Sequence, residues 1–252
     1  MATRCEVYRL GLIEYERAWR LQARLAEEIG RGQRPPALLL LEHPPTYTFG
    51  RRGQEQNLLW DEETRRERGV RVYWVDRGGD VTYHGPGQLV GYPLLPLAPG
   101  GLRTDLVQGK PRLPQADYVG YLRRLEQALI QTLAAFGVVG RQIAGLTGVW
   151  VSPPAASQPE PAKIAALGVK VDVRGVSRHG FALNVAPDMT YWEGIIGCGL
   201  ENQRVTSLAD IVDPPPTVER VGQELIQAFD EVLGYRMQPR PADLAALEST
   251  LI

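Results

Sequence analysis

The hydrophobic positions of this chain repeat with two periods, and each period predicts a different kind of element. Apolar side chains three or four residues apart, typical of the buried face of a helix, occur in four segments. These predict helices at residues 14–29, 115–136, 218–233 and 241–251. Gly30 and Gly137 follow the first two segments and Thr217 precedes the third, where glycine commonly ends a helix and threonine commonly begins one.

Shorter apolar runs, rich in Val, Ile and Leu and bounded by Gly or Pro, predict β-strands. They lie at residues 37–42, 70–75, 89–97, 148–152, 164–173 and 181–185. The strands outnumber the helices and do not alternate with them one by one, which excludes a doubly wound nucleotide-binding fold. The pattern predicts an α/β fold of the α+β type, in which helices flank a mixed β-sheet.

Segments rich in glycine and proline divide these elements. Residues 98–114, 152–162 and 213–216 have no hydrophobic period and are expected to be loops. The last of them reads D-P-P-P and marks a boundary. We therefore expect a main domain over residues 1–212 and a C-terminal helical segment, 213–252, packed on the same domain.

Charge and composition exclude several classes of protein. The 252 residues carry 28 basic and 29 acidic side chains, so the net charge of −1 gives no general attraction for nucleic acid or an anionic membrane, and neither is expected as a partner. No apolar stretch approaches the roughly 18 residues of a membrane span, and the N-terminus lacks the apolar core of a signal peptide. Two cysteines cannot form a disulfide framework, so we expect a reducing compartment, the cytoplasm.

The densest chemical cluster reads R-G-G-D-V-T-Y-H-G-P-G-Q at residues 77–88, directly after a predicted strand. Glycines allow the backbone to approach a ligand closely, and Arg77, Thr82, Tyr83 and His84 supply side-chain donors. The spacing matches neither a Walker A loop nor a dinucleotide-binding G-x-G-x-x-G. A ligand-binding loop is the hypothesis here, and an ordinary glycine-rich turn is the alternative.

A cysteine and a lysine are candidates for nucleophilic chemistry. Cys198 lies between Gly197 and Gly199, which leave its thiol sterically open, whereas Cys5 is expected to be a core residue. A reactive thiolate needs a nearby cation or base. Only three of the 28 basic residues are lysines, and Lys163 begins an apolar strand where a partly desolvated amine could accept a proton. A buried structural cysteine and a lysine whose ammonium reaches the surface remain the alternatives.

The histidines complete the set of candidates. His179 precedes the apolar strand G-F-A-L-N-V and could orient a substrate carbonyl, or it could be a hydrogen-bonded structural residue. Three histidines and two cysteines without C-x-x-C or H-E-x-x-H spacing predict no metal site.

Four sequence blocks together resemble one family, the octanoyltransferases of lipoate biosynthesis. They are L-E-H-P-P with Y-T and G-R at residues 41–51, the loop at 77–88, K-I-A-A-L-G-V at 163–169, and H-G-F-A-L-N-V at 179–185 followed by Cys198 and Gly199. The resemblance implies a mixed α/β fold similar to the catalytic domain of biotin and lipoate protein ligases, placed over residues 1–212.

The resemblance also implies an activity and its residues. Family members transfer an octanoyl group from acyl carrier protein to a lysine on the lipoyl domains of 2-oxoacid dehydrogenases and on the glycine cleavage H protein. Carried over by motif, Cys198 is the nucleophile that forms an acyl thioester and Lys163 is its base. No cofactor is implied, because the donor is carried on the phosphopantetheine of acyl carrier protein. The implied binding residues are Arg77, Gly78, Gly79, Asp80, Val81, Thr82, Tyr83, His84, Ala166, Leu167, Gly168, Gly180, Phe181 and Ala182, supported by His179 and Asn184.

Two other functions remain open from the sequence. An ATP-dependent lipoate or biotin protein ligase would share the fold but has no use for Cys198. A non-catalytic module that binds acyl carrier protein or lipoyl domains would function without it too. Because both partners are acidic, arginines at 51–52 or 65–66 are a candidate docking surface.

Overall fold

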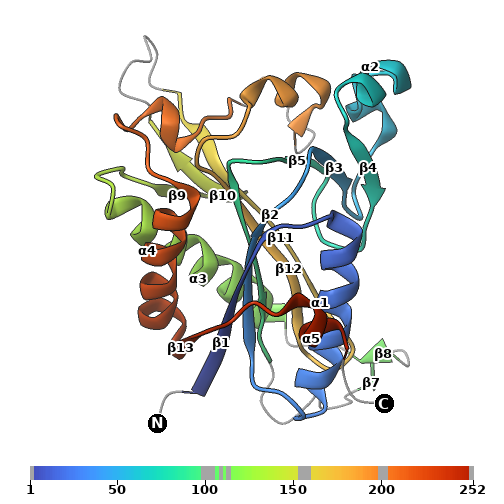
Figure 1. The fold of residues 1–252 in the computed structure, drawn as a ribbon, viewed down its shortest axis with the longest axis vertical. Helices are drawn as coiled ribbons and strands as arrows, with labels where there is room; N and C mark the ends of the chain where they lie inside the picture. Colours follow the sequence, from blue (N-terminus) through green and yellow to red (C-terminus); the bar gives the residue numbers. More distant parts are fainter. Residues whose placement is uncertain are drawn as a thin grey trace.

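The computed structural model describes residues 3–97, 106–107, 110–111, 115–152, 160–197 and 204–249, with the backbone alone at 106–107, 110–111 and 115–117. An eight-stranded sheet forms its centre (Figure 1). In order across the sheet the strands are β13 (Tyr235–Arg240), β1 (Thr3–Leu12), β2 (Ala37–Glu42), β6 (Gln88–Leu94), β12 (Ser177–Asn184), β11 (Ala162–Val171), β10 (Leu146–Val151) and β9 (Arg141–Ile143). β1 is parallel to both neighbours and the other pairs are antiparallel, which confirms the predicted mixed sheet.

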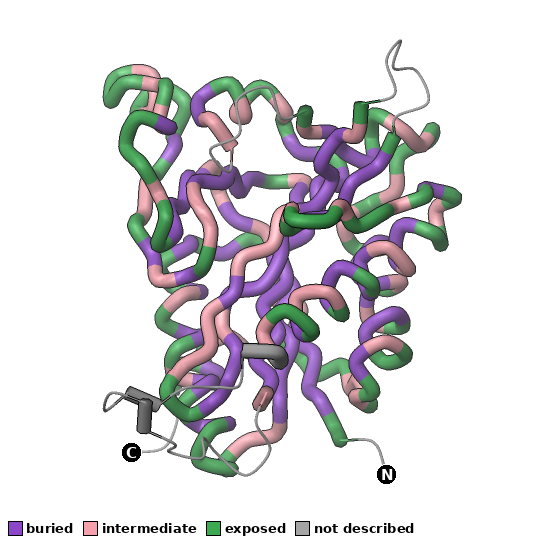
Figure 2. The backbone as a smooth tube through the Cα atoms, turned by 180° about the vertical axis from the view of Figure 1, so that it is seen from behind, coloured by how far each residue is buried: buried purple, intermediate pink, exposed green. Residues whose placement is uncertain are grey.

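Helices cover both faces of this sheet. α1 (Tyr15–Gly30) and α5 (Leu244–Glu248) lie on one face, and α3 (Gln115–Ala134) and α4 (Val218–Leu233) lie on the other (Figure 1). The sequence of β2 explains this, because its side chains alternate: Leu38 and Leu40 join the core under α3 and α4, whereas Leu39 and Leu41 join the core under α1. The central strands are accordingly buried along most of their length (Figure 2).

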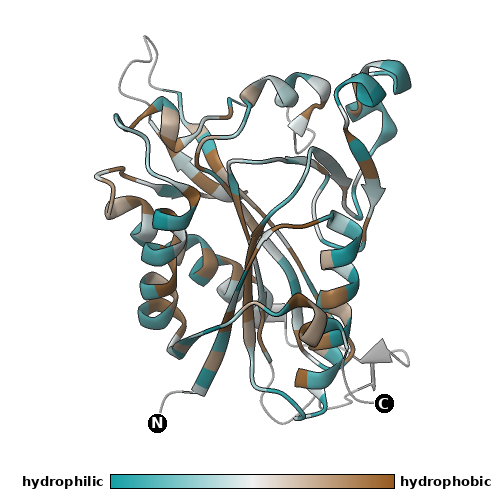
Figure 3. Cartoon of the chain, in the orientation of Figure 1, coloured by the Kyte–Doolittle hydropathy of each residue, from teal (hydrophilic) through white to brown (hydrophobic). Residues whose placement is uncertain are grey.

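A second, three-stranded sheet stands beside one end of the first. Its order is β4 (Arg71–Trp74), β3 (Thr46–Phe49) and β5 (Val81–His84), and the hydrophilic helix α2 (Glu62–Glu67) lies next to it (Figure 3). β2 leads into β3 and β5 leads into β6, so two connections join the small sheet to the large one. Gly87 makes the second connection compact, since its φ is +85° and a Cβ there would lie 2.3 Å from the carbonyl oxygen of Ala186. The predicted ligand loop therefore lies at the junction of the two sheets.

The remaining elements are short. β7 (Leu106–Val107) and β8 (Lys110–Pro111) pair with each other, and 3-10 helices occupy Glu55–Asn57, Met189–Gly194 and Leu208–Asp210. Within the described ranges, no helix combines the length and the apolarity needed to cross a membrane.

Most elements predicted from the pattern are present. The helices predicted at 14–29, 115–136 and 218–233 are α1, α3 and α4, and all six predicted strands are found within a few residues of their expected bounds. The sequence pattern does not predict the helix α2 or seven of the strands, namely β1, β3, β5, β7, β8, β9 and β13. The loops expected at 98–114 and 152–162 lie largely outside the described residues.

The C-terminal segment differs from its prediction. Residues 213–252 were expected to be helical, but β13 adds a strand to the large sheet and pairs in parallel with β1 from Thr3 to Tyr8. The helix expected at 241–251 is reduced to α5 at Leu244–Glu248. Tyr235 and Met237 pack against the core on alternate positions of β13, which is a strand pattern that its charged neighbours conceal in the sequence.

Candidate active site

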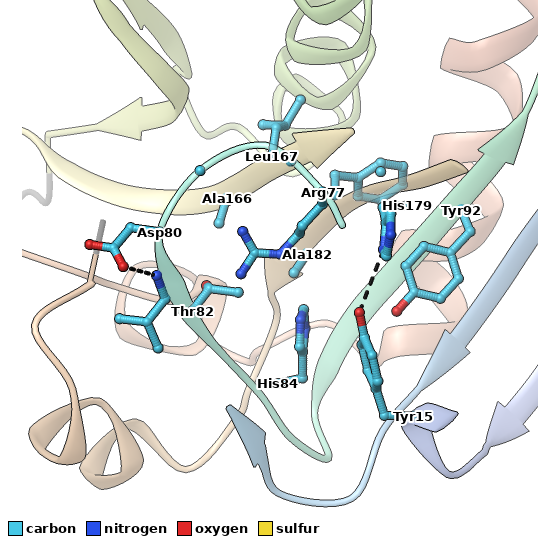
Figure 4. Close-up of a pocket in the computed structure, with 15 residues that line it drawn as sticks. Tyr15, Arg77, Asp80, Thr82, His84, Tyr92, Ala166, Leu167, His179 and Ala182 are labelled. Atoms are coloured by element: carbon cyan, nitrogen blue, oxygen red, sulfur yellow. Dashed lines mark hydrogen bonds between the residues drawn. The ribbon is translucent and has the colours of Figure 1, made fainter. Parts of the chain in front are cut away.

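A small cavity of about 50 Å³ lies between the two sheets (Figure 4). The glycine-rich loop and β5 form one wall, β11 and β12 form another, and Tyr15 of α1 and Tyr92 of β6 close it. From the sequence-predicted set the lining includes Arg77, Gly79, Asp80, Val81, Thr82, His84, Ala166, Leu167, Gly168, His179, Gly180, Phe181 and Ala182. The fold thus brings together three sequence blocks that are far apart in the chain.

Small residues on β11 and β12 leave the space for this cavity. Ala166 lies directly opposite Ala182 in the strand register, and Gly168 lies opposite Gly180. A Cβ on Gly168 would be 2.9 Å from the carbonyl oxygen of Gly78, so the glycine-rich loop rests on this strand where no side chain can fit. Leu167 belongs to the side chains packed with the core under α3, so its side chain points away from the cavity (Figure 4).

Arg77 and Asp80 hold the glycine-rich loop in place. Arg77 is buried, and its guanidinium donates to the carbonyl oxygen of Gly78 at 2.9 Å and to the hydroxyl of Thr48 on β3 at 3.0 Å. The Asp80 carboxylate accepts hydrogen bonds from its neighbour's backbone N–H at 2.7 Å and from the side chain of Asn57 at 2.5 Å. Both residues therefore organise the loop, and Arg77 also brings a positive charge to the cavity wall.

Two buried histidines beside the cavity are neutral. His43 Nδ1 is 2.7 Å from the carbonyl oxygen of Ile13, which can only accept, so Nδ1 carries the proton and Nε2 accepts from the hydroxyl of Tyr92 at 2.7 Å. Burial lowers the pKa of His43 to about 4. Burial also lowers the pKa of His84, with smaller contributions from His43 and Arg77. These side chains supply hydrogen bonds and aromatic surface rather than charge.

His179 is held by an acidic residue that is not among the candidates from the sequence, Asp76. The distance from His179 Nε2 to Asp76 Oδ1 is 2.8 Å, and the same carboxylate pairs with Arg178 at 2.7 Å and with Lys170. Burial alone would raise the pKa of Asp76, but the hydrogen bonds from His179 and Lys170 and the charge of Arg178 outweigh it and lower the pKa. Among the described residues other than glycine, His179 alone has a positive φ, of 57°. Such a conformation persists only where the surroundings fix it.

Lys163 lies in a second, larger cavity that adjoins the first. This cavity has a volume of about 450 Å³, and the two share Gly79, Asp80, Leu167 and Gly168 in their walls. Lys163 is only 4% exposed, and its ammonium lies 4.9 Å from the centre of the Trp150 ring.

The chain on both sides of Cys198 is described, but Cys198 itself lies outside the described residues. Gly197, which precedes Cys198, lies against Trp192. A Cβ on Gly197 would be 3.2 Å from the Trp192 ring. After it, the carbonyl oxygen of Arg204 accepts a hydrogen bond from the backbone N–H of Lys163 at 2.8 Å, and Thr206 donates to the carbonyl oxygen of Lys163 at 3.0 Å. The segment that follows Cys198 in the sequence therefore pairs with the backbone of Lys163.

Three expected residues lie elsewhere. Gly78 lines the larger cavity instead of the smaller one. Tyr83 points to the opposite side of β5, where it stacks on Tyr191 at 5.2 Å between ring centres, because alternate residues of a strand face opposite sides. Asn184 donates to the carbonyl oxygen of Thr206 at 3.0 Å and so supports the segment after Cys198.

Several residues around the two cavities are not indicated by the sequence, and four of them contact a histidine or Lys163. These four are Tyr15, Asp76, Tyr92 and Trp150. Asp76 directly precedes R-G-G-D, which is the one local signal that could have found it. The described part of the chain contains no group of three or more His, Cys, Asp or Glu side chains suited to hold a metal ion.

Comparisons with known proteins place this architecture in a family. Residues 14–230 match the model of the lipoyl protein ligase A/B catalytic domain. An octanoyltransferase of Chloroflexus aurantiacus is 43% identical over 239 residues, which cover 95% of this chain and 97% of that protein. An octanoyltransferase of Acidobacterium capsulatum is 43% identical over 247 residues, 96% of each chain.

Solved structures agree on the fold. A structure of a protein from Thermoplasma acidophilum, described as a putative lipoate protein ligase with bound lipoic acid, superimposes with a TM-score of 0.66 at 18% identity, covering 98% of this chain and 94% of the other. At this identity the likeness concerns the fold alone. The curated relatives and the family model together confirm the resemblance seen in the sequence: the chain belongs to the lipoyl protein ligase A/B catalytic-domain family and, within it, to the octanoyltransferases.

Proposed function

We propose that this acyltransferase moves an octanoyl group from the thioester of acyl carrier protein to the ε-amine of a lysine on a lipoyl domain, with Cys198 as nucleophile and Lys163 as base. The observation that carries the proposal is the position of Lys163. Its amine is buried in a cavity that adjoins a small-residue pocket, and its backbone pairs with the segment that follows Cys198. A reactive thiol needs a base within reach, and the pairing of Lys163 with the segment after Cys198 supports Lys163 in that role.

The small cavity supports the acyl-binding half of this proposal. Ala166 and Ala182 leave room for a hydrocarbon chain, and each methylene that leaves water contributes about 0.8 kcal/mol. The hydroxyl of Thr82 is buried without a hydrogen-bond partner among the described residues, so it can donate to a carbonyl oxygen of the bound substrate.

The first half-reaction transfers the acyl group to the enzyme. Lys163 accepts the proton of the Cys198 thiol, and the thiolate attacks the carbonyl carbon of the octanoyl thioester. The tetrahedral intermediate collapses, the bond between this carbon and the pantetheine sulfur breaks, and Lys163 returns its proton to the departing sulfur. Backbone N–H groups of the glycine-rich segments would stabilise the oxyanion.

In the second half-reaction the uncharged amine of the acceptor lysine attacks the acyl-Cys198 carbonyl. The amide forms, the bond to the Cys198 sulfur breaks, and Lys163 accepts the proton that the amine loses. One thioester replaces another before the amide forms, so the donor supplies the energy and neither ATP nor another cofactor is needed. A free lysine amine is the acceptor expected on a lipoyl domain, and the Thermoplasma acidophilum ligase is described together with its E2 lipoyl domain.

A transfer assay tests this function. Purified enzyme, octanoyl acyl carrier protein and an unmodified lipoyl domain are mixed without ATP, and the mass of the lipoyl domain is followed. We expect the wild-type enzyme to octanoylate the lipoyl domain and the variant Cys198→Ser not to do so. ATP with free octanoate should not substitute for octanoyl acyl carrier protein. Modification that requires ATP and the free acid would instead indicate a ligase, which the octanoyltransferase relatives do not favour.

A further inference from the structure

A turn with two arginines borders the cavity that contains Lys163. It reads Gly50-Arg51-Arg52-Gly53, and its backbone is fixed on the glycine-rich loop: Arg51 donates to the carbonyl oxygen of Arg77 at 2.9 Å, and Arg52 to that of Gly79 at 3.1 Å. A Cβ on Gly50 would lie 2.4 Å from the Gly79 oxygen, so only glycine allows the turn to approach this closely. The fold therefore presents these two arginines from a rigid base.

Both arginine side chains reach solvent, and that of Arg52 does so at the cavity. Arg52 lines the larger cavity together with Lys163, and both arginines are exposed. Within the described part of the chain, neither guanidinium forms an ion pair or a side-chain hydrogen bond. Two other arginines of the small-sheet region differ in this respect, because Arg68 donates to Thr190 at 3.2 Å and Arg71 to Glu14 at 2.6 Å.

Tyr118 of α3 lines the same cavity from the other side. Burial raises the pKa of its hydroxyl, and the charge of Arg51 opposes that effect, so Arg51 acts electrostatically on this cavity as well. Arg52 and Tyr118 therefore line the cavity that contains Lys163, and Arg51 is exposed next to Arg52 in the turn. All three side chains can donate hydrogen bonds to an anion.

We propose that Arg51 and Arg52 form an anion subsite for the phosphate of the donor's phosphopantetheine arm. This inference rests on the proposed function, because the arm must enter this cavity to bring its thioester to Lys163. The arm carries a single phosphate at the end remote from the thioester, and guanidinium groups bind phosphate through paired hydrogen bonds. Since both arginines are exposed, screening keeps the effect modest, and we expect it to be about tenfold at low salt.

Two small donors separate the effect of the phosphate from the effects of the carrier protein. Octanoyl-4′-phosphopantetheine and octanoyl-pantetheine differ only in this group, and the second-order rate constant for acylation of the enzyme is measured with each. The wild-type enzyme should prefer the phosphorylated donor about tenfold, less as salt is added. The double variant Arg51→Gln with Arg52→Gln should lose this preference while its rate with octanoyl-pantetheine stays unchanged, which also shows that it is folded.

Two further variants sharpen the result. Arg52→Lys keeps a charge without the planar pair of donors and should retain part of the preference. Arg66→Gln removes an exposed arginine from α2 and should behave as the wild type.

The proposal is overturned if the double variant keeps the full preference, or if it loses rate equally with both donors. If neither donor acylates the wild-type enzyme, both the proposed function and the subsite are wrong. If both donors acylate it at the same rate, only the subsite is wrong.

Discussion

The ammonium of Lys163 lies 4.9 Å from the centre of the Trp150 ring, and the two residues are partners in the register of β11 and β10. An aromatic face attracts a cation, so the Trp150 ring helps to hold the Lys163 side chain at this point. Gly148, two residues before Trp150, has a φ of 137° and leaves room for the Lys163 stem, since a Cβ there would be 3.0 Å from Lys163 Cε. Its N–H donates to the buried carboxylate of Glu126 at 2.9 Å, which fixes this part of β10.

We predict that Trp150→Leu slows acylation of the enzyme by about 3- to 30-fold, because a cation over an aromatic ring contributes about 0.5–2 kcal/mol. Without the ring the Lys163 side chain is held less firmly, so its amine should lie less often where it can accept the Cys198 proton. The rate of alkylation of Cys198 by iodoacetamide against pH measures this directly. Trp150→Phe retains an aromatic ring, so its acylation rate should lie between those of the wild type and Trp150→Leu.

The matched control for this prediction is Trp74→Leu, which removes an indole that is 51% exposed on the small sheet. It should leave the alkylation profile unchanged. If Trp150→Leu alkylates with the wild-type profile although its melting temperature is preserved, the ring has no influence on the reactive pair.

Asp76 is expected to make stability depend on pH. Its pKa is lowered in the folded protein, so its contribution is complete above the unfolded-state value of about 3.9 and is lost as pH falls toward the lower folded value. Asp76→Asn should therefore cost about 1–3 kcal/mol at pH 7, because His179, Arg178 and Lys170 lose a charged partner. Urea unfolding should show a smaller difference in the free energy of unfolding between the wild type and Asp76→Asn at pH 3 than at pH 7. The same difference at both pH values would contradict a lowered pKa of Asp76.

Ala182 on the cavity floor is predicted to control the length of the acyl chain. It is 4% exposed and lies opposite Ala166, so a larger side chain must occupy the cavity. Ala182→Val should slow acylation by octanoyl donors at least tenfold and should affect butanoyl donors much less. Ala209→Val, at an exposed position of a 3-10 helix, provides the control. Equal losses with both chain lengths would show that Ala182 does not border the acyl chain.

Local sequence patterns were sufficient for the elements with a continuous signal. The stripe of Leu125, Leu129 and Leu133 predicts α3, and the run of four leucines in β2 predicts a strand buried on both faces. β3 and β5 were missed because their four residues each, T-Y-T-F and V-T-Y-H, mix polar and aromatic side chains and do not form the apolar run that predicts a strand. β13 was missed because Arg236, Gln238 and Arg240 alternate with its packed residues at the edge of the sheet.

The candidate site also contains residues that the sequence indicates and residues that it does not. The glycine-rich loop and the small residues of β11 and β12 are visible in the sequence as motifs. Tyr15, Asp76, Tyr92 and Trp150 are not, because what defines each of them is a contact with a residue far away in the chain. The pairing of Asp76 with His179 spans 103 positions, and no local period can indicate it.

The proposed mechanism requires Cys198 to carry the octanoyl group as a thioester. Intact-protein mass spectrometry after mixing the enzyme with octanoyl acyl carrier protein, without ATP and without an acceptor, tests it most directly. We predict an added octanoyl mass on the wild-type enzyme that hydroxylamine removes, that is absent in Cys198→Ser, and that accumulates more slowly in Lys163→Ala. An unmodified wild-type enzyme that still octanoylates a lipoyl domain, or an adduct that persists in Cys198→Ser, would contradict the mechanism.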